Sequence, residues 1–140
     1  MDKEKLLKAL DNEDNEILFH FTTKTLKELN FKVLRELNLT PQDLRDLMEK
    51  VNGYMYIDDI KHLKYGSYLR WICVNDPNDL YLNQGGTLCE IKEGTKGVTL
   101  VCKNFTRRHF SITFDECLVF QRLTDQEKVL LSALDHLSTK

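Results

Sequence analysis

The sequence lacks the features that would anchor the chain in a membrane or export it. None of its apolar runs approaches the ~18–20 residues that cross a bilayer. The N-terminal stretch MDKEKLLKALDNEDNE is charged, and it has neither the apolar core nor the small-residue cleavage site of a signal peptide. We therefore expect an intracellular, cytoplasmic protein that does not bind membranes.

An excess of either charge is also missing. Lys and Arg number 20 against 22 Asp and Glu, so the net charge is −2. This balance gives no general attraction for nucleic acid, and any such binding must come from a local cluster. With 140 residues, 41% hydrophobic and 30% charged, the chain is suited to one globular domain, or to one domain with a helical appendage.

The spacings that hold metals or build catalytic sites are absent as well. The sequence has no CxxC pair, no HxH or HxxxH pair and no GxSxG motif. We therefore expect no cofactor, no metal and no catalytic residue, with a small hydrolase as a distant alternative. Because three of the four cysteines alternate with apolar residues, core thiols are favoured over disulfides or metal ligands. The cysteines are Cys73, Cys89, Cys102 and Cys117.

The first half of the chain is predicted to be helical. Thr25 and Glu28 have the spacing of a capping box, in which each side chain satisfies a backbone amide at the start of a helix. Thr40 precedes a proline, which marks a second helix start. The short apolar run Glu16–Phe21 fits a helix and a strand equally. Three helices are expected, at residues 2–10, 25–37 and 41–51.

Beyond Gly53 the apolar period changes to two, which indicates strands. Alternating segments between turn-rich stretches predict about five short antiparallel strands. They are expected at residues 66–74, 80–93, 97–103 and 110–116, with 54–60 as a further strand or a connector and 117–123 continuing extended. The stretch EGTKG predicts a hairpin loop of about four or five residues.

A final helix is predicted from Thr124, which has capping-box spacing to Glu127. Its buried stripe is expected to comprise Leu130, Ala133, Leu134 and Leu137. Together these elements predict an α+β fold. A helical hairpin at residues 1–52 precedes a small antiparallel β-barrel or curled sheet at 53–140, SH3-like or Tudor-like, which the C-terminal helix closes.

The pair Gly85-Gly86 is either a loop that cradles a ligand or a bend in a strand. No helix follows the glycines, so no helix N-terminus is aimed at an anion. The apolar alternation also resumes directly after them. We therefore expect a hinge that curls the strand and places Trp71 and Cys89 in the core.

Two groups of residues are candidates for function. Basic residues near aromatic ones are typical of nucleic-acid contacts; they are Lys92, Lys96, Lys103, Arg107 and Arg108. A meander places them at two ends of a strand, ~20 Å apart. The expected partner surface includes Tyr54, Tyr56 and Tyr68. The favoured function is a non-enzymatic interaction module that binds a protein partner or itself, and the alternative is a nucleic-acid-binding accessory factor.

The second half of the chain also resembles a known group. The stretches GSYLRWI, LYLNQGGTLCEI and VTLVCKNF, and most specifically FSITFDECLVFQRLTDQE at Phe110–Glu127, resemble a family of small uncharacterised proteins of large and giant DNA viruses. The resemblance implies a viral origin and expression in the host cytosol or a viral factory, with packaging into virions as a further option. It implies no activity and no catalytic residue.

Overall fold

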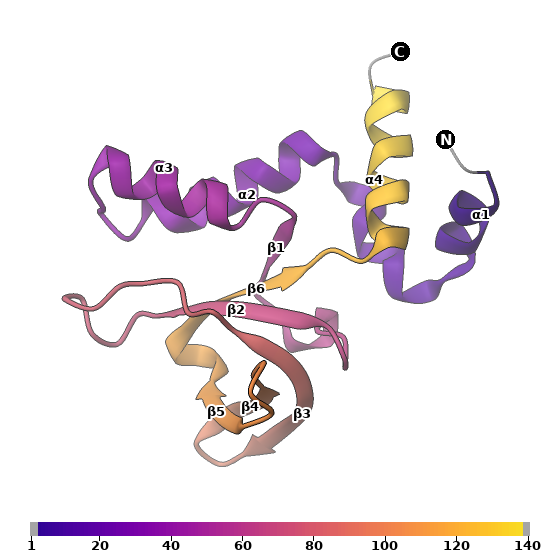
Figure 1. Cartoon of the computed structure of the whole chain (residues 1–140). Coiled ribbons are helices and arrows are strands. Elements are labelled where there is room, and N and C mark those ends of the chain that lie inside the picture. The colour runs from indigo at the N-terminus through magenta and orange to yellow at the C-terminus, as the bar shows by residue number, and fades with distance from the viewer. Residues whose placement is uncertain (1–2, 139–140) are drawn as a thin grey trace. The chain divides into compact units, whose positions relative to one another are not determined.

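The computed structural model describes residues 3–138, and over this range the chain is an α+β protein. It divides into two compact units (Figure 1). The helical unit is discontinuous and is formed by the residues up to Met55 together with those from Leu123 onward; the sheet unit is Tyr56–Arg122. No helix in the described range is both long and apolar enough to cross a membrane.

The described part of the helical unit contains four α-helices and one 3-10 helix. They are α1 (Lys3–Asp11), η1 (Glu13–His20), α2 (Thr23–Arg35), α3 (Pro41–Lys50) and α4 (Asp125–Ser138). The predicted helices are therefore confirmed, and the ambiguous run at 16–21 falls largely in η1. Figure 1 shows α3 running back beside α2, and α1 beside α4.

Threonine side chains set the starts of α3 and α4. Thr40 Oγ1 accepts a hydrogen bond from the Asp43 amide at 3.1 Å. At α4, Thr124 Oγ1 accepts from the Glu127 amide at 3.1 Å, while the Thr124 amide donates to the Glu127 carboxylate at 2.9 Å. The predicted capping box of the C-terminal helix is thus confirmed.

The predicted start of α2 is wrong by three residues. Thr22 is the cap: its Oγ1 accepts from the Thr25 amide at 3.2 Å, and its own amide donates to Thr25 Oγ1 at 2.7 Å. Thr25 is therefore the partner inside the helix rather than the cap, and Glu28 is not part of the box. The pairs Thr22–Thr25 and Thr25–Glu28 both have the three-residue spacing of a capping box, and the first pair forms it.

The helix α4 belongs to the helical unit, whereas the predicted division after residue 52 placed it with the strands. It packs against α1 and η1, and it buries Leu130 and Leu131. Leu137 was predicted to be buried but is 64% exposed. Leu137 lies in the last turn of α4. The apolar face of a helix is buried only where neighbouring elements pack against it.

The strands form one six-stranded antiparallel sheet in the order β1-β6-β2-β3-β4-β5. They are β1 (Tyr54–Ile57), β2 (Tyr68–Cys73), β3 (Gly86–Gly94), β4 (Gly97–Lys103), β5 (His109–Thr113) and β6 (Cys117–Arg122). The sheet has two edge strands, so it is open rather than a closed barrel. Gly94 pairs with Gly97, so the β3–β4 hairpin closes through two residues and is tighter than predicted.

The pair Gly85-Gly86 sits where the chain passes tightly between two strands. Gly85 has φ 90°, and a Cβ there would collide with the carbonyl oxygen of Leu69 in β2. A Cβ on Gly86 would lie 2.7 Å from the carbonyl oxygen of Lys103 in β4. No larger residue fits at either position without displacing a strand. The glycines therefore allow the backbone to bend here, as the bend interpretation predicts.

Cys89 is exposed, which contradicts its predicted place in the core. The register of β3 shifts at this point: Leu88 lies opposite Cys102, and Ile91 lies opposite Leu100. Leu88 and Ile91 thus share a face although they are three residues apart. Cys89 lies in the β-bulge that produces this shift, and the bulge turns its side chain outward.

The rest of the sheet core follows the prediction more closely. Trp71 is only 3% exposed and packs against Phe110, with ring centroids 5.2 Å apart. The buried Gln121 is satisfied at both ends of its amide, since it donates to the His62 carbonyl at 3.1 Å and accepts from the Lys64 amide at 2.8 Å. These bonds hold the loop before β2 against β6.

Candidate functional site

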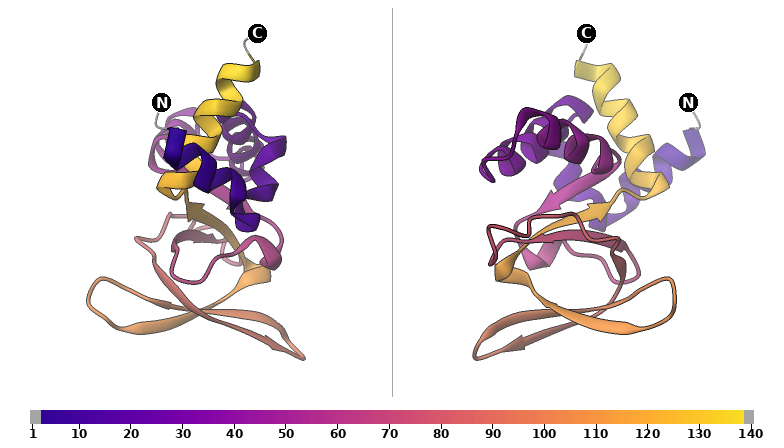
Figure 2. Two further views of the ribbon diagram at one scale, coloured as in Figure 1. Left: turned by 90° about the vertical axis from the view of Figure 1, so that its right-hand side faces the viewer. Right: turned by 60° about the vertical axis from the view of Figure 1, so that its left-hand side comes forward.

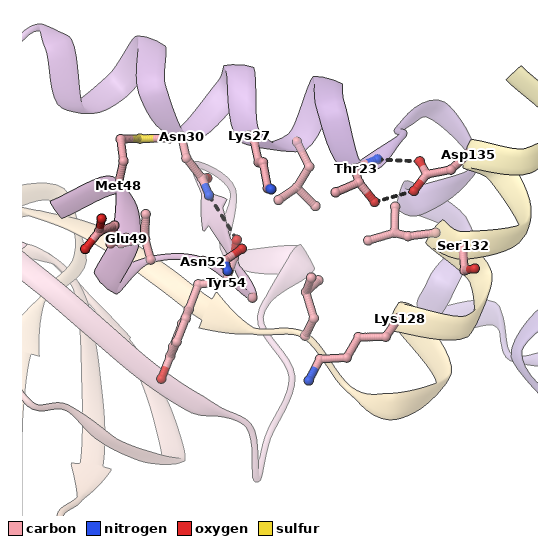
Figure 3. A pocket seen from close by; sticks show the side chains of 15 residues that line it. Thr23, Lys27, Asn30, Met48, Glu49, Asn52, Tyr54, Lys128, Ser132 and Asp135 are labelled. Atoms are coloured by element: carbon pink, nitrogen blue, oxygen red, sulfur yellow. Dashed lines mark hydrogen bonds between the residues drawn. The ribbon is translucent and has the colours of Figure 1, made fainter. Parts of the chain in front are cut away.

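A cleft of about 490 Å³ opens within the helical unit (Figure 3). Its walls come from α2, the end of α3 and α4, and the residues that follow α3 and precede α4 complete it. This volume lies in the range of pockets that hold a small ligand or a few side chains of a peptide.

The floor of the cleft is apolar and is held by backbone bonds. Leu26 of α2, Val51 after α3 and Leu131 of α4 line it and are buried. The amide of Leu123 donates to the Gly53 carbonyl at 2.9 Å, which joins the residue before α4 to the residue after α3. Segments about 70 positions apart in sequence are thereby fixed side by side.

Asn30 ties α2 to the same floor. It is 2% exposed, and its Nδ2 donates to the Tyr54 carbonyl at 3.0 Å (Figure 3). A buried amide costs free energy unless it is hydrogen-bonded, so this contact fixes the distance between α2 and the start of β1.

A second tie links α2 to α4 at the edge of the cleft. Asp135 accepts two hydrogen bonds from Thr23, one from its amide at 2.7 Å and one from its hydroxyl at 2.5 Å. Thr23 is the first residue of α2, so the carboxylate also lies at the positive end of that helix. Both carboxylate oxygens accept hydrogen bonds from Thr23. Asp135 therefore holds α2 and α4 together at the edge of the cleft.

Two lysines face into the cleft from different helices. Figure 3 shows Lys27 on α2 and Lys128 on α4 with their ammonium groups directed into the open space. Both residues are exposed, and neither ammonium has an ion-pair partner within residues 3–138. The acidic Glu49 lies at the α3 side, beside Met48. The α2–α4 side is therefore cationic above an apolar floor.

The three tyrosines predicted as partner surface are in different places. Tyr54 lines the cleft but is only 8% exposed. The ring of Tyr56 packs against Phe120 in the sheet unit, with centroids 5.7 Å apart. Tyr68 donates its hydroxyl hydrogen to the Gln84 carbonyl and has the Arg122 guanidinium 4.5 Å from its ring centroid. Only Tyr54 contributes to the cleft.

The predicted basic residues lie in two groups at opposite ends of β4. Lys92 and Lys96 adjoin the β3–β4 turn, and the others adjoin the β4–β5 turn. Figure 2 shows these two turns pointing away from each other in both views. Seven residues of β4 separate them, which corresponds to roughly 20 Å. The second group comprises Lys103, Arg107 and Arg108.

The β4–β5 turn also presents an aromatic ring. Phe105 is 79% exposed. Asn104 Oδ1 organises the turn by accepting from the amides of Thr106 and Arg108, each at 3.0 Å, and Arg107 adopts a left-handed φ of 65°. An exposed ring and arginines are thus held within one short turn.

Sequence reasoning did not find the cleft, because its parts are distant in the chain. Thr23 and Asp135 are 112 positions apart, and no motif links them. One local signal was present in Asn30, which stands four residues after Leu26 on the otherwise apolar face of α2. A polar residue on such a face points to a specific hydrogen-bond partner, although it does not name that partner.

No group of three or more His, Cys, Asp or Glu side chains within residues 3–138 is placed to hold a metal ion. Comparisons of the chain with protein-family models, with curated proteins and with solved structures gave no match. The cleft is therefore interpreted from its own geometry and charge.

Proposed function

We propose that this chain is a non-enzymatic interaction module whose cleft receives an amphipathic segment of a protein partner. The observation that supports this proposal is the apolar floor beneath Lys27 and Lys128, two lysines that form no ion pair with any side chain the structure describes. Apolar side chains at helical spacing would enter the floor, and acidic residues beside them would meet the ammonium groups.

Charge and shape favour a peptide over a polynucleotide in this cleft. A phosphate backbone would meet the lysines but would leave the apolar lining of the cleft without an apolar partner. Burying apolar surface contributes about 25 cal/mol per Å², whereas two exposed lysines mainly select the sign of the partner's charge.

The test uses two fluorescent peptides that share one apolar helical face and differ in the flanking charge. One carries Glu and the other carries Lys at the positions beside the apolar residues. We expect the acidic peptide to bind at least tenfold more tightly, with a difference that shrinks as salt is raised, because the rim charges are solvent-exposed. Fluorescence anisotropy measures both affinities.

Three variants locate the binding. Ser132→Trp places a large ring in the cleft from an exposed position of α4, and we expect it to abolish binding. Lys27→Glu should reverse the preference between the two peptides. Lys32→Glu makes the same charge change on α2 but outside the cleft. It should leave the preference for the acidic peptide unchanged. Equal affinity of the Ser132→Trp variant and the unchanged protein would refute the proposal.

Nucleic-acid binding is the second candidate function, and the β4–β5 turn favours it. Phe105 offers an exposed ring for base stacking, and Lys103, Arg107 and Arg108 offer phosphate contacts in the same region. Lys92 and Lys96 would be a separate contact, because they lie at the other end of β4.

Two further expectations remain proposals. The likeness of the strands to an SH3-like or Tudor-like barrel is supported by their short antiparallel pairing, the tight passage at Gly85-Gly86 and the bulge at Cys89. A viral origin, with a place in the host cytosol or a viral factory, is supported by the resemblance of Phe110–Glu127 to proteins of large DNA viruses.

A further inference from the structure

Two cysteine thiols of the sheet unit lie in contact across neighbouring strands. Cys73 ends β2 and Cys117 begins β6, and the two residues are directly opposite in the antiparallel register. Their Sγ atoms are 3.2 Å apart, and both thiols are reduced. A disulfide bond is ~2.05 Å long, so the sulfurs are within about 1.2 Å of bonding distance.

The backbone around this pair is already spaced for a disulfide. The amide of Val74 donates to the Glu116 carbonyl at 2.9 Å, so Val74 and Glu116 form a hydrogen-bonded pair. Because such pairs alternate along an antiparallel ladder, Cys73 and Cys117 form the adjacent non-hydrogen-bonded pair. The Cα atoms of such pairs are ~4.5 Å apart, within the ~4.4–6.8 Å that disulfides span. Rotation of the side chains is enough to close the bond.

The position of the pair also gives an oxidant access to it. Cys73 and Cys117 are half-buried at the end of the β2–β6 ladder, whereas Cys102 is fully buried and Cys89 is exposed in the bulge of β3. We propose that Cys73 and Cys117 are a reversible oxidation site, which a small disulfide such as oxidised glutathione converts into a cross-strand disulfide.

The reaction is a thiol–disulfide exchange in two steps. Cys73, as its thiolate, attacks one sulfur of oxidised glutathione; a mixed disulfide forms, and one glutathione thiolate leaves. Cys117 then loses its proton and attacks the Cys73 sulfur, and the second glutathione thiolate leaves. The two protons lost from the cysteines end on the two glutathione thiols, so two cysteines are oxidised and one glutathione disulfide is reduced.

The environment of Cys117 suits the second step. Burial, together with the hydrogen bond to the Cys73 thiol, raises the pKa of Cys117 to about 12. Cys117 therefore stays protonated near neutral pH and reacts only once the mixed disulfide has formed beside it. The site itself follows from the cross-strand geometry.

The disulfide would join two neighbouring strands that flank β3, β4 and β5 in the sequence. Cys73 and Cys117 are 44 positions apart, and β3, β4 and β5 lie between them. Because folding already holds the sulfurs together, the folded protein should form this bond far more readily than the unfolded chain. We expect the equilibrium constant for closure to be roughly 100-fold larger in the folded protein.

The experiment equilibrates the whole protein with defined mixtures of reduced and oxidised glutathione, with and without urea. Mass spectrometry of the intact protein and of its peptides measures the fraction that has lost two hydrogen atoms and identifies the joined cysteines. We expect one intramolecular bond between Cys73 and Cys117, which reduced glutathione reverses and which raises the midpoint of thermal unfolding by several degrees.

Matched variants separate this pair from the other thiols. Cys89→Ser should form the same bond, whereas Cys73→Ser and Cys117→Ser should form no intramolecular disulfide. Circular dichroism confirms that each variant is folded, and Cys73→Ala replaces Cys73→Ser if serine disrupts the strand. A bond between other cysteines, or an equilibrium no different from that in urea, would overturn the proposal.

Discussion

At the scale of single residues, the thiols of the sheet unit show how strongly position controls chemistry. Cys102 has no exposed surface, and burial raises its pKa from 9.0 to about 12, with a smaller contribution from nearby Cys89. Cys89 itself is exposed on the bulge of β3. Two cysteines in neighbouring strands therefore differ sharply in accessibility.

We expect Cys102 to make folding stability fall above pH 9. The unfolded chain ionises this thiol near pH 9, and the folded chain keeps it protonated until about pH 12. Its contribution is therefore fully present below pH 9 and is lost as the pH rises towards 12, with a slope of at most about 1.4 kcal/mol per pH unit.

Urea unfolding at a series of pH values measures this slope through the fluorescence of the single tryptophan, the buried Trp71. Cys102→Ala removes the contribution, while Cys89→Ala should keep it. Burial also raises the pKa of Cys117 to about 12, but Cys117 is common to all three proteins, so the difference in slopes isolates Cys102. Identical slopes for Cys102→Ala and the unchanged protein would contradict the assignment.

Residue-level prediction from sequence succeeded where local pattern decides burial. Trp71 and Cys102 were expected inside, and both are buried. Cys89 failed because simple alternation assumes an unbroken ladder, and the bulge beside it reverses the faces. The bulge depends on how β3 meets β4, and a single strand carries little information about its partner.

At the scale of elements, the signals that worked were those contained within four consecutive residues. The box Thr124–Glu127 was predicted and is present because both of its hydrogen bonds are local. The start of α2 was misplaced because Thr22–Thr25 and Thr25–Glu28 both have capping-box spacing. The sequence does not indicate which of the two pairs forms the box. The tight β3–β4 turn likewise depends on the pairing of Gly94 with Gly97.

The glycine bend gives a sharp test at this scale. We expect Gly85→Ala to destabilise the fold by roughly 3 kcal/mol or more, because the added Cβ collides with the backbone of β2 at a positive φ. Gly94→Ala is the control: the nearest atom to its Cβ is 3.9 Å away, so the cost should stay within about 1 kcal/mol.

Urea unfolding monitored by Trp71 fluorescence compares the two glycine variants. If Gly85→Ala keeps its stability and loses only a binding activity, the glycines belong to a ligand loop after all.

At the scale of the whole molecule, the weak net charge frames the question of nucleic-acid binding. A chain of net charge −2 repels a polyanion slightly at long range. Binding must therefore come from a local basic cluster such as the one at the β4–β5 turn. Composition gives only the net charge of the whole chain and not where the basic residues lie. It therefore could not decide between peptide binding and nucleic-acid binding.

We expect the β4–β5 turn to bind single-stranded RNA or DNA only weakly, with strong salt dependence. Removing two cations by Arg107→Ala with Arg108→Ala should lower the affinity and flatten the dependence on salt, because fewer counterions are released. Lys92→Ala with Lys96→Ala is the charge-matched control at the opposite end. Filter binding at two salt concentrations measures both, and no binding at low salt would eliminate this candidate.

The discontinuous helical unit has a consequence for the order in which a nascent chain matures. The ribosome completes every residue of the sheet unit before it reaches Leu123, and α4 emerges only afterwards. The wall that carries Lys128, Leu131 and Asp135 is thus the last part of the cleft to be made. Under the proposed function, a translation product that stops before α4 lacks this wall of the cleft and should not bind the partner peptide.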